Sequence, residues 1–462
     1  MLQPSIYTVK VLSLAVMTIF SANTLASESN STFKNELQPP TTNQSELSSN
    51  MQTSSYELPE PLTLKSVLAL PETVSPQVIA SQSRQVQAQA DYALQDATNS
   101  VELNVLGRIG WREYADHIED NHLLALHVGK KLYDFGQTQA LIDAQEKISE
   151  AQAQLYEDQV MQFKIQLMQT FFNVILSDFQ YRIENETMAI AYVALDKAKD
   201  RYELNRISDV DYFKLQSDYE KILVKRARAE YEQRRTRTAL ANLVGQPNQL
   251  PDKLLLPRLK SIEARKLKEL ERYQEQTLAN NFQLKSLQLK LQAAQHRLEG
   301  ESATDKPTFR VDAWGGKLST YEYHREGRWR FDLSMDYPLY DGGIRSARVS
   351  RARAEVQELE AQVTELEQHL RDQVADLYFK LKLSDAEQKQ NKAFGDYADL
   401  YLDYSRALYE NESTTDLGDS MVRLSEANFQ VISQQFKQAL YWAQLDYLTG
   451  ASIQLATTRQ PD

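Results

Sequence analysis

The sequence predicts a mainly α-helical protein with a small β part, in which long antiparallel coiled-coil helices are joined to four strands of the kind that cross a membrane. The first observation is a doubled phrase, LYDFGQ at 132–137 and LYDGGI at 339–344, with Tyr133 and Tyr340 lying 207 residues apart. The second is a change in hydrophobic spacing at each copy, from every second residue before it to every third or fourth residue after it. That change is the one expected where a strand gives way to a helix.

Composition excludes several classes of function. The net charge of −12 argues against nucleic acid as a partner, because phosphate contacts need clustered Lys and Arg. The chain has no cysteine, which excludes disulfides, thiolate metal sites and cysteine nucleophiles. Its six histidines are scattered, and it has neither a G-x-S-x-G motif nor a phosphate-binding loop. We therefore expect no catalytic residues, no metal site, no cofactor and no enzymatic activity.

The two ends of the chain are expected to lie outside the fold. Residues 1–26 have the pattern of a signal peptide, with Lys10 before the apolar run VLSLAVMTIFSA (11–22) and a small residue, Ala26, at the cleavage site. A buried first helix is the alternative reading of this run. Residues 27–57, rich in Ser, Thr, Asn and Gln, predict a disordered linker, and 453–462 form a C-terminal tail. No later segment has 18 uncharged apolar residues, so membrane contact would have to come from strands.

The doubled phrase belongs to a repeat of the whole chain. Residues 58–250 and 251–452 each predict a helix, a β-hairpin and a long helix pair, in the same order. The pairs Asp209-Val210 and Asp416-Leu417 are again 207 residues apart. Chance does not explain agreement over this length.

Alternating apolar and polar residues predict the two hairpins, at 101–133 and 308–340, with polar loops at 115–121 and 321–327. The clearest strand alternates over eleven residues, which is the length that crosses a membrane with one face toward lipid and one toward a lumen. Its apolar positions are Trp329, Phe331, Leu333, Met335, Tyr337 and Leu339.

Four strands cannot close a transmembrane barrel alone, because single-chain barrels begin at about eight strands. An open sheet edge in lipid would leave backbone groups unpaired. Several chains must therefore pool their hairpins if these strands lie in a membrane. The alternative is a soluble four-stranded sheet packed under the helices.

The long helical stretches carry the spacing of a coiled coil. In the second repeat, apolar residues recur at every third or fourth position from Val356 to Leu381, and the first repeat has the same rhythm from Ala144 to Leu155. A single helix from about 138 to 204 would reach on the order of 100 Å at 1.5 Å per residue. Such a length suits a conduit or a strut rather than a globular domain.

This arrangement explains the doubled phrase as a joint between strand and helix, needed once per repeat. Asp134 and Asp341 are placed to cap the first turn of the helix that follows. Gly136, Gly342 and Gly343 permit the sharp change of direction.

With these features in place, the sequence resembles the TolC-like family of outer membrane efflux proteins, the outer membrane factors, over nearly all of 58–452. The resemblance rests on LTLKSVLAL (62–70), LYDFGQ, PLYDGG (338–343), RYELNRISDVDYFKLQSDYEKI (201–222) and LYENESTTDLGDSMVRLSEANF (408–429). It implies a homotrimer whose twelve pooled strands form a β-barrel in the outer membrane of a Gram-negative bacterium, continued by a periplasmic α-barrel. It also implies passive export of drugs or proteins in a tripartite efflux or type I secretion system. The implied partners are outer membrane lipid, a periplasmic adaptor and an inner-membrane pump of RND or ABC type.

The resemblance also assigns the far ends of the helices. Asn205, Asp209 and Asn411 would form the periplasmic tip turns, where Asn tolerates the left-handed conformation. Asp416 and Asp419 fall where the family has an acidic pore constriction, and their i, i+3 spacing puts both carboxylates on one helical face. The alternative is a pair of ordinary helix-start aspartates.

A second class of function stays open at this point. The chain could be a periplasmic coiled-coil adaptor or structural protein without a pore. The alternating strands favour the channel.

Overall fold

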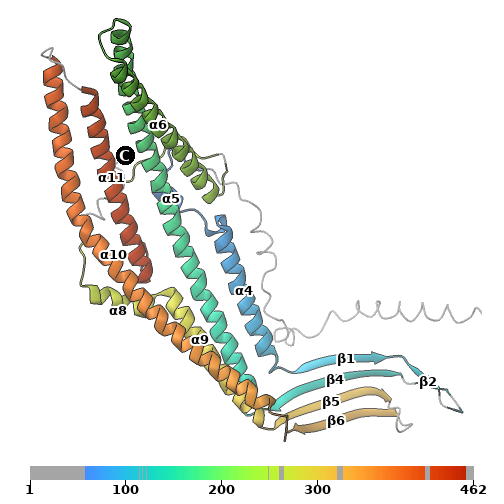
Figure 1. The fold of residues 1–462 in the computed structure, drawn as a ribbon. Coiled ribbons are helices and arrows are strands. Elements are labelled where there is room, and N and C mark those ends of the chain that lie inside the picture. The colour runs from blue at the N-terminus through green and yellow to red at the C-terminus, as the bar shows by residue number, and fades with distance from the viewer. Residues whose placement is uncertain are drawn as a thin grey trace, which may run out of the picture. The chain divides into compact units, whose positions relative to one another are not determined.

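The computed structural model describes residues 58–453, apart from 114, 117, 121, 248, 260–264, 320–325 and 411–416. The predicted signal peptide, the predicted linker and the predicted tail beyond Ile453 lie outside the described residues. The elements follow one another in this order (Figure 1): α3 (Leu64–Leu68), η2 (Glu72–Val74), α4 (Pro76–Ala97), β1 (Glu102–Arg108), β2 (Trp111–Glu113), β3 (Ile118–Asp120), β4 (Leu123–Tyr133), α5 (Gln137–Glu203), α6 (Asp209–Leu243), α8 (Leu270–Asn280), α9 (Phe282–Ser302), η3 (Ala303–Asp305), β5 (Thr308–Ser319), β6 (Glu326–Asp336), α10 (Ile344–Glu410) and α11 (Leu417–Leu448).

The two halves of the chain repeat the same elements. Helices α5 and α10 have 67 residues each, and α10 begins and ends 207 positions after α5. Each follows a hairpin strand, and each is followed by a second long helix that runs back beside it, α6 in the first half and α11 in the second. The mainly helical fold with a small antiparallel sheet is as predicted.

The sheet and the helix turns lie at opposite ends of this part of the chain. Figure 1 shows the four main strands at the end where α5 and α10 begin, and the α5–α6 turn at the other end. Helix α9 packs against both α5 and α10 near the sheet, while α11 packs against α5 and α10 further along. Within the residues that the structure describes, none of the helices is both long enough and apolar enough to cross a membrane.

The hydrophobic core lies about midway along α5 and α10, where α6, α9 and α11 also contribute buried residues. Phe172 of α5 and Phe436 of α11 stack at its centre with ring centroids 4.0 Å apart, and both are almost fully buried. The heptad positions Leu370, Val374 and Leu381 of α10 are buried in the same cluster. The coiled-coil spacing read from the sequence thus marks a packed face of α10.

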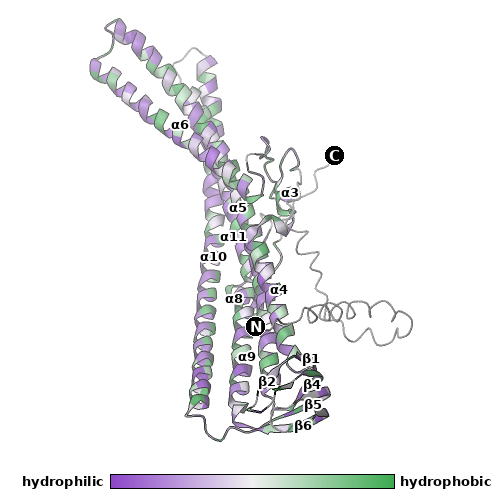
Figure 2. Ribbon diagram, turned by 90° about the vertical axis from the view of Figure 1, so that its right-hand side faces the viewer, coloured by the Kyte–Doolittle hydropathy of each residue, from purple (hydrophilic) through white to green (hydrophobic). Residues whose placement is uncertain are grey.

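The main sheet is antiparallel, with strand order β1-β4-β5-β6. Leu103 lies opposite Val128, Val128 opposite Ala313, and Ala313 opposite Phe331. This register puts one set of alternate residues of all four strands on one face. Figure 2 shows hydrophobic and hydrophilic residues interleaved along the strands.

Two details of the predicted hairpins are wrong. The first predicted loop, 115–121, contains strand β3, which pairs with β2 and extends the hairpin. Backbone pairing continues there without an apolar face because the two strands are already aligned by β1 and β4. Strand β6 ends at Asp336, although the alternation suggested a strand to Leu339, because Pro338 has no N–H to donate to a neighbour.

Candidate functional site

One face of the sheet carries a connected set of charged side chains. Nε2 of His127 on β4 lies 2.9 Å from Oδ1 of Asp312 on β5. Arg310 of β5 donates from Nε to the same carboxylate at 3.1 Å and from Nη2 to Glu102 of β1 at 2.9 Å. The His127 and Asp312 side chains are only 14% exposed even in the single chain. These contacts tie β1, β4 and β5 together through charges rather than through a hydrophobic core.

Gly129 makes this arrangement possible. Strand β4 lies between β1 and β5, so Arg310 must pass over β4 to reach Glu102. A Cβ at position 129 would lie 2.6 Å from Nη2 of Arg310 and 2.9 Å from Oδ1 of Asp312, closer than side chains pack. The absence of a side chain at Gly129 is therefore what leaves room for the guanidinium.

A second row of residues on the same face is centred on an aromatic side chain. Trp314 of β5 lies opposite His127 on one side and Arg330 on the other. The His127 ring stacks on Trp314 with centroids 4.8 Å apart and planes 20° apart, and the Arg330 guanidinium carbon is 4.8 Å from the Trp314 centroid. Arg330 is also paired with Asp332 at 2.5 Å. This polar face combines charge with flat rings, which suits contact with water and with dissolved molecules.

The opposite face of the sheet is apolar and uncovered. Within the single chain its side chains are largely exposed; examples are Val105 at 73%, Phe331 at 61% and Leu333 at 65%. A soluble sheet packed under the helices would bury this face, so that alternative is wrong. The further exposed members are Leu103, Leu124, Leu126, Val128, Trp329 and Met335.

At the first strand-to-helix joint, Asp134 is buried and caps the start of α5. Its Oδ2 accepts hydrogen bonds from the backbone N–H of Thr138, at 2.9 Å, and from the Thr138 hydroxyl. Burial acts to raise the pKa of Asp134, but these bonds and the nearby Lys131 ammonium outweigh it and hold the pKa below its ordinary value. Gly136 has φ of 89°, in the left-handed region that a glycine adopts without strain.

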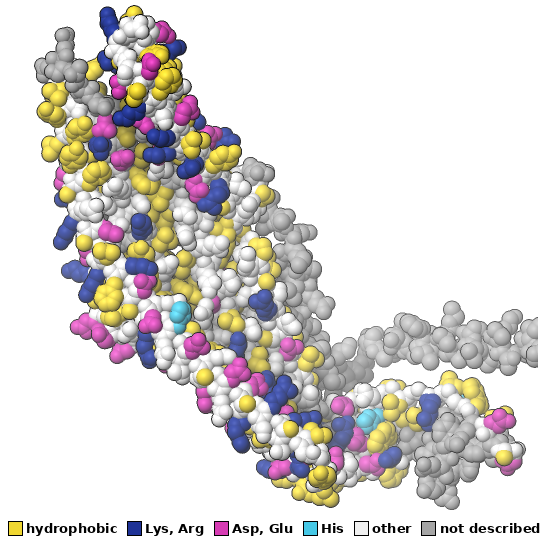
Figure 3. All heavy atoms as spheres, viewed as in Figure 1, with side chains coloured by type: hydrophobic (Ala, Val, Ile, Leu, Met, Phe, Trp, Pro, Cys, Tyr) yellow, Lys and Arg dark blue, Asp and Glu magenta, His cyan; other side chains and the backbone are white. Residues whose placement is uncertain are grey.

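The second joint is built in the same way. Asp341 accepts from the backbone N–H of Arg345 at 2.8 Å and of Gly343 at 3.0 Å, and Arg345 also forms an ion pair with it. The backbone bond from Arg345 is the main cause of the lowered pKa of Asp341. Gly342 and Gly343 have φ of 69° and 90°. In the space-filling view, Lys and Arg side chains gather where the sheet meets the helices (Figure 3).

At the far end, the turn between α5 and α6 contains Asn205, whose φ is 56°. Ser208 caps α6 by accepting from the backbone N–H of Asp211 at 3.1 Å, and Asp209 is the first residue of that helix. The rings of Tyr202 and Tyr212 stack across the turn with centroids 4.5 Å apart. The negative charge of Asp209 raises the pKa of Tyr202.

Of the predicted constriction, the structure describes one residue. Asn411 and Asp416 lie outside the described residues. Asp419 lies in the first turn of α11, where its Oδ2 accepts from Nε of Arg423 at 2.8 Å. This ion pair was missed at the sequence level, although the i, i+4 spacing of Asp419 and Arg423 could have indicated it.

The polar face of the sheet was also missed as a site. Its members lie in separate hairpins, and His127 and Asp312 are 185 residues apart. Alternation indicated that these residues share a face, but only the register between β4 and β5 shows which of them touch. Among the described residues, no cluster of His, Asp or Glu could hold a metal ion.

Comparison with known proteins identifies the family of the second repeat. Residues 274–451 match the model of the family described as outer membrane efflux protein. These residues belong to the outer membrane efflux protein family. The resemblance seen in the sequence, the efflux function and the outer membrane location are thereby confirmed. This is a family of transport proteins rather than of enzymes. No curated protein matches the chain.

The fold of this chain is shared with solved channel structures. It is similar to the CmeC outer membrane channel of Campylobacter jejuni, with a TM-score of 0.71 and 11% identity over 84% of this chain and 85% of that one. It is also similar to the outer membrane protein VceC of Vibrio cholerae, with a TM-score of 0.68 and 14% identity over 85% and 97% of the two chains. The chain is similar as well to the MtrE outer membrane channel of Neisseria gonorrhoeae, with a TM-score of 0.65 and 15% identity over 86% of this chain and 91% of that one. At these identities the likeness shows the fold.

Proposed function

We propose that this chain is one subunit of a passive exit duct, in which the four strands cross the outer membrane and the long helices continue the duct through the periplasm. The observation that carries the proposal is the two-faced sheet. Val105, Phe331 and Leu333 give one face the apolar surface that lipid requires, while His127, Asp312 and Trp314 give the other a surface suited to water.

The edges of the sheet require further copies of the chain. Strands β1 and β6 are the outer strands of the described sheet, so each leaves one row of backbone groups open to a neighbour. In lipid these groups must be paired, and the pairing is complete only in a closed ring. Two copies would reach the minimum of about eight strands; the resemblance to the family favours three copies and twelve strands.

The helices offer matching surfaces for the same neighbours. Helix α10 has a second seam at heptad spacing whose side chains are exposed in the single chain; we call it the α10 seam. It runs through Phe379, Leu383, Ala386, Gln390, Ala393, Tyr397, Leu400 and Tyr404. Helix α6 has a corresponding α6 seam, which runs through Val210, Phe213, Ser217, Glu220, Val224, Ala227 and Tyr231. Unpartnered heptad seams are surfaces for other helices, so we propose that the α10 seam of one copy packs on the α6 seam of the next.

The remaining partners follow from the position of the helix turns. The proposal places the α5–α6 turn at Asn205 and Asp209, together with Asn411, at the periplasmic tip. There a periplasmic adaptor and an inner-membrane pump of RND or ABC type would deliver the exported molecule. Asp416 and Asp419 would form the acidic constriction at this tip.

Replacement of Leu400 by Asp tests the assembly. Leu400 is 70% exposed in the single chain but lies on the α10 seam, where the proposed interface would bury it, so an unpaired charge there should break the trimer. Native mass spectrometry of detergent-extracted protein should show trimers for the wild type and monomers for L400D. Leu204→Asp is the matched control, because Leu204 is 63% exposed and lies off both seams. Trimers that survive in L400D, or a monomer that conducts in a planar bilayer, would contradict the proposal.

A further inference from the structure

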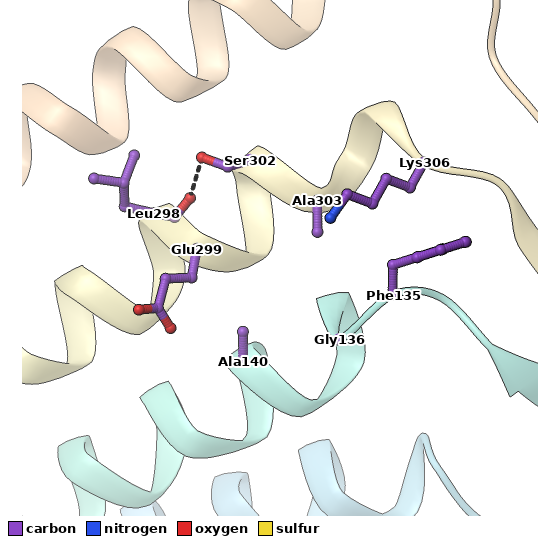
Figure 4. Close-up of a pocket in the computed structure, with 8 residues that line it drawn as sticks. All are labelled: Phe135, Gly136, Ala140, Leu298, Glu299, Ser302, Ala303 and Lys306. Carbon is purple, nitrogen blue, oxygen red and sulfur yellow. Dashed lines mark hydrogen bonds between the residues drawn. The ribbon is translucent and has the colours of Figure 1, made fainter.

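The first strand-to-helix joint is hollowed by a cavity of about 440 Å³ (Figure 4). Its walls come from the start of α5, the end of α9 and η3. Ala140, Leu298 and Ala303 give it an apolar lining, and Glu299 and Lys306 lie on two sides of the same hollow. The size lies within the range of about 300–1,000 Å³ that small-molecule sites occupy.

The apolar face of the sheet continues into this cavity. Lys131 of β4 pairs with Arg310 on the polar face, but the register shifts after it and Tyr133 pairs with Phe309. Phe309 in turn lies opposite Met335, on the apolar face. The β-bulge therefore turns Tyr133 toward the apolar side. Phe135, a wall of the cavity, packs on Tyr133 with ring centroids 4.7 Å apart.

Cations lie at the same border. Nζ of Lys306 is 5.6 Å from the centroid of the Phe135 ring, and no carboxylate of the described residues forms an ion pair with it. Lys130 lies opposite Val311 on the apolar face, directly before the bulge. A lysine beside aromatic rings at the end of an apolar band is the arrangement of a membrane interface, where the stem stays in the apolar layer and the ammonium reaches the headgroups.

We propose that this cavity binds a glycerophospholipid with an amine-bearing headgroup from the periplasmic leaflet. The headgroup phosphate lies at the Lys306 ammonium, the headgroup amine at the Glu299 carboxylate, and the first part of an acyl chain over Phe135 and Tyr133. Oε2 of Glu299 also lies 3.2 Å from Nδ1 of His296. The inference rests on the proposed function, because only a sheet that crosses the outer membrane brings this joint to the level of the headgroups.

Lipid retention tests the inference. Full-length protein is extracted in detergent, relipidated with phosphatidylethanolamine or phosphatidylglycerol, and examined by native mass spectrometry. The wild type should retain phosphatidylethanolamine, about one molecule per chain, in preference to phosphatidylglycerol. Lys306→Gln should weaken retention about fivefold, the factor that corresponds to roughly 1 kcal/mol for one headgroup charge contact. Ala303→Trp, which fills the cavity, should abolish it, and Glu299→Gln should remove the preference between the two lipids.

Lys290→Gln is the matched control, because Lys290 lies on α9 but outside the cavity. Retention that is equal in the wild type, K306Q and A303W would overturn the inference. Equal retention of the two lipids by the wild type would overturn the role of Glu299. Displacement of the lipid by millimolar glycerol 3-phosphate would show that the cavity is a site for free phosphate compounds instead. Conductance of the wild type in a planar bilayer is measured alongside. If the wild type does not conduct, the exit duct is contradicted. If it conducts but retains no lipid, only the lipid site is contradicted.

Discussion

The start of α11 rests on α5 through a glycine, and adding one methyl group there should change the tip of the duct. A Cβ on Gly418 would lie 2.9 Å from Cγ1 and 3.1 Å from Cδ1 of Ile190. Ordinary contact begins at 3.4 Å, so Gly418→Ala must displace the Ile190 side chain by a few tenths of an ångström, and we expect the two helices to move apart as a result. A second contact, from the Ser425 hydroxyl to Glu186 at 2.9 Å, holds the same two helices together and resists the movement.

The size of the effect follows from the cost of overpacking, which is typically about 1–3 kcal/mol. That cost shifts the balance between packed and displaced positions of the α11 start by about 5- to 150-fold. Because Asp419 is the next residue, the displacement also moves the proposed constriction. We expect G418A to raise the single-channel conductance, or the fraction of time spent in the higher-conductance state.

Two further variants make the experiment decisive. Ile190→Ala combined with G418A removes the clash and should return the conductance to that of the wild type. Gly395→Ala adds a methyl group to α10 where nothing lies within 4 Å, and it should have no effect. An unchanged conductance in G418A, or a change that I190A does not reverse, would refute the reasoning.

Further predictions concern the tip, the joint and the sheet. Asp416→Asn with Asp419→Asn should lower cation selectivity and weaken block by multivalent cations added from the periplasmic side, as measured by single-channel recording at low salt. Because the pKa of Asp134 is lowered in the folded state, its stabilising effect is complete above the ordinary carboxyl pKa and is lost as the pH falls through the lowered one. The thermal dissociation temperature of Asp134→Asn should therefore lie below that of the wild type at pH 7, and the difference should shrink in acid. Gly129→Ala should displace Arg310 from the Glu102 carboxylate and alter the reversal potential in a salt gradient, and an unchanged potential would count against a luminal polar face.

The parts of the fold that sequence reasoning predicted are those encoded locally. The joints depend on Asp134 and Asp341, which bond to amides at most four residues away, and on glycines at positive φ. The long helices depend on spacing within one segment. Each of these patterns occurs twice in the sequence, once in each repeat, so the order of the elements could be predicted from a single chain.

The missed features depend on contacts between distant segments. The pairing of His127 with Asp312 requires β4 to lie beside β5, and the role of Gly129 requires an arginine from another hairpin. The strand β3 was missed because it has no apolar face and is held by its neighbours' backbone. The missed ion pair of Asp419 with Arg423 is the exception, because these two residues lie only four positions apart on α11.

The most direct test of the account is to determine which face of the sheet lines the water-filled path. The chain has no cysteine, so a single introduced cysteine is the sole target for a charged, water-soluble thiol reagent. Ser334 and Leu333 are neighbours on β6, and their register partners Arg310 and Val311 place them on the polar and the apolar face. During single-channel recording, the reagent should reduce the current through Ser334→Cys within seconds to minutes and leave Leu333→Cys unchanged. A current that falls in L333C, or in neither variant, would contradict a duct whose lumen is the polar face.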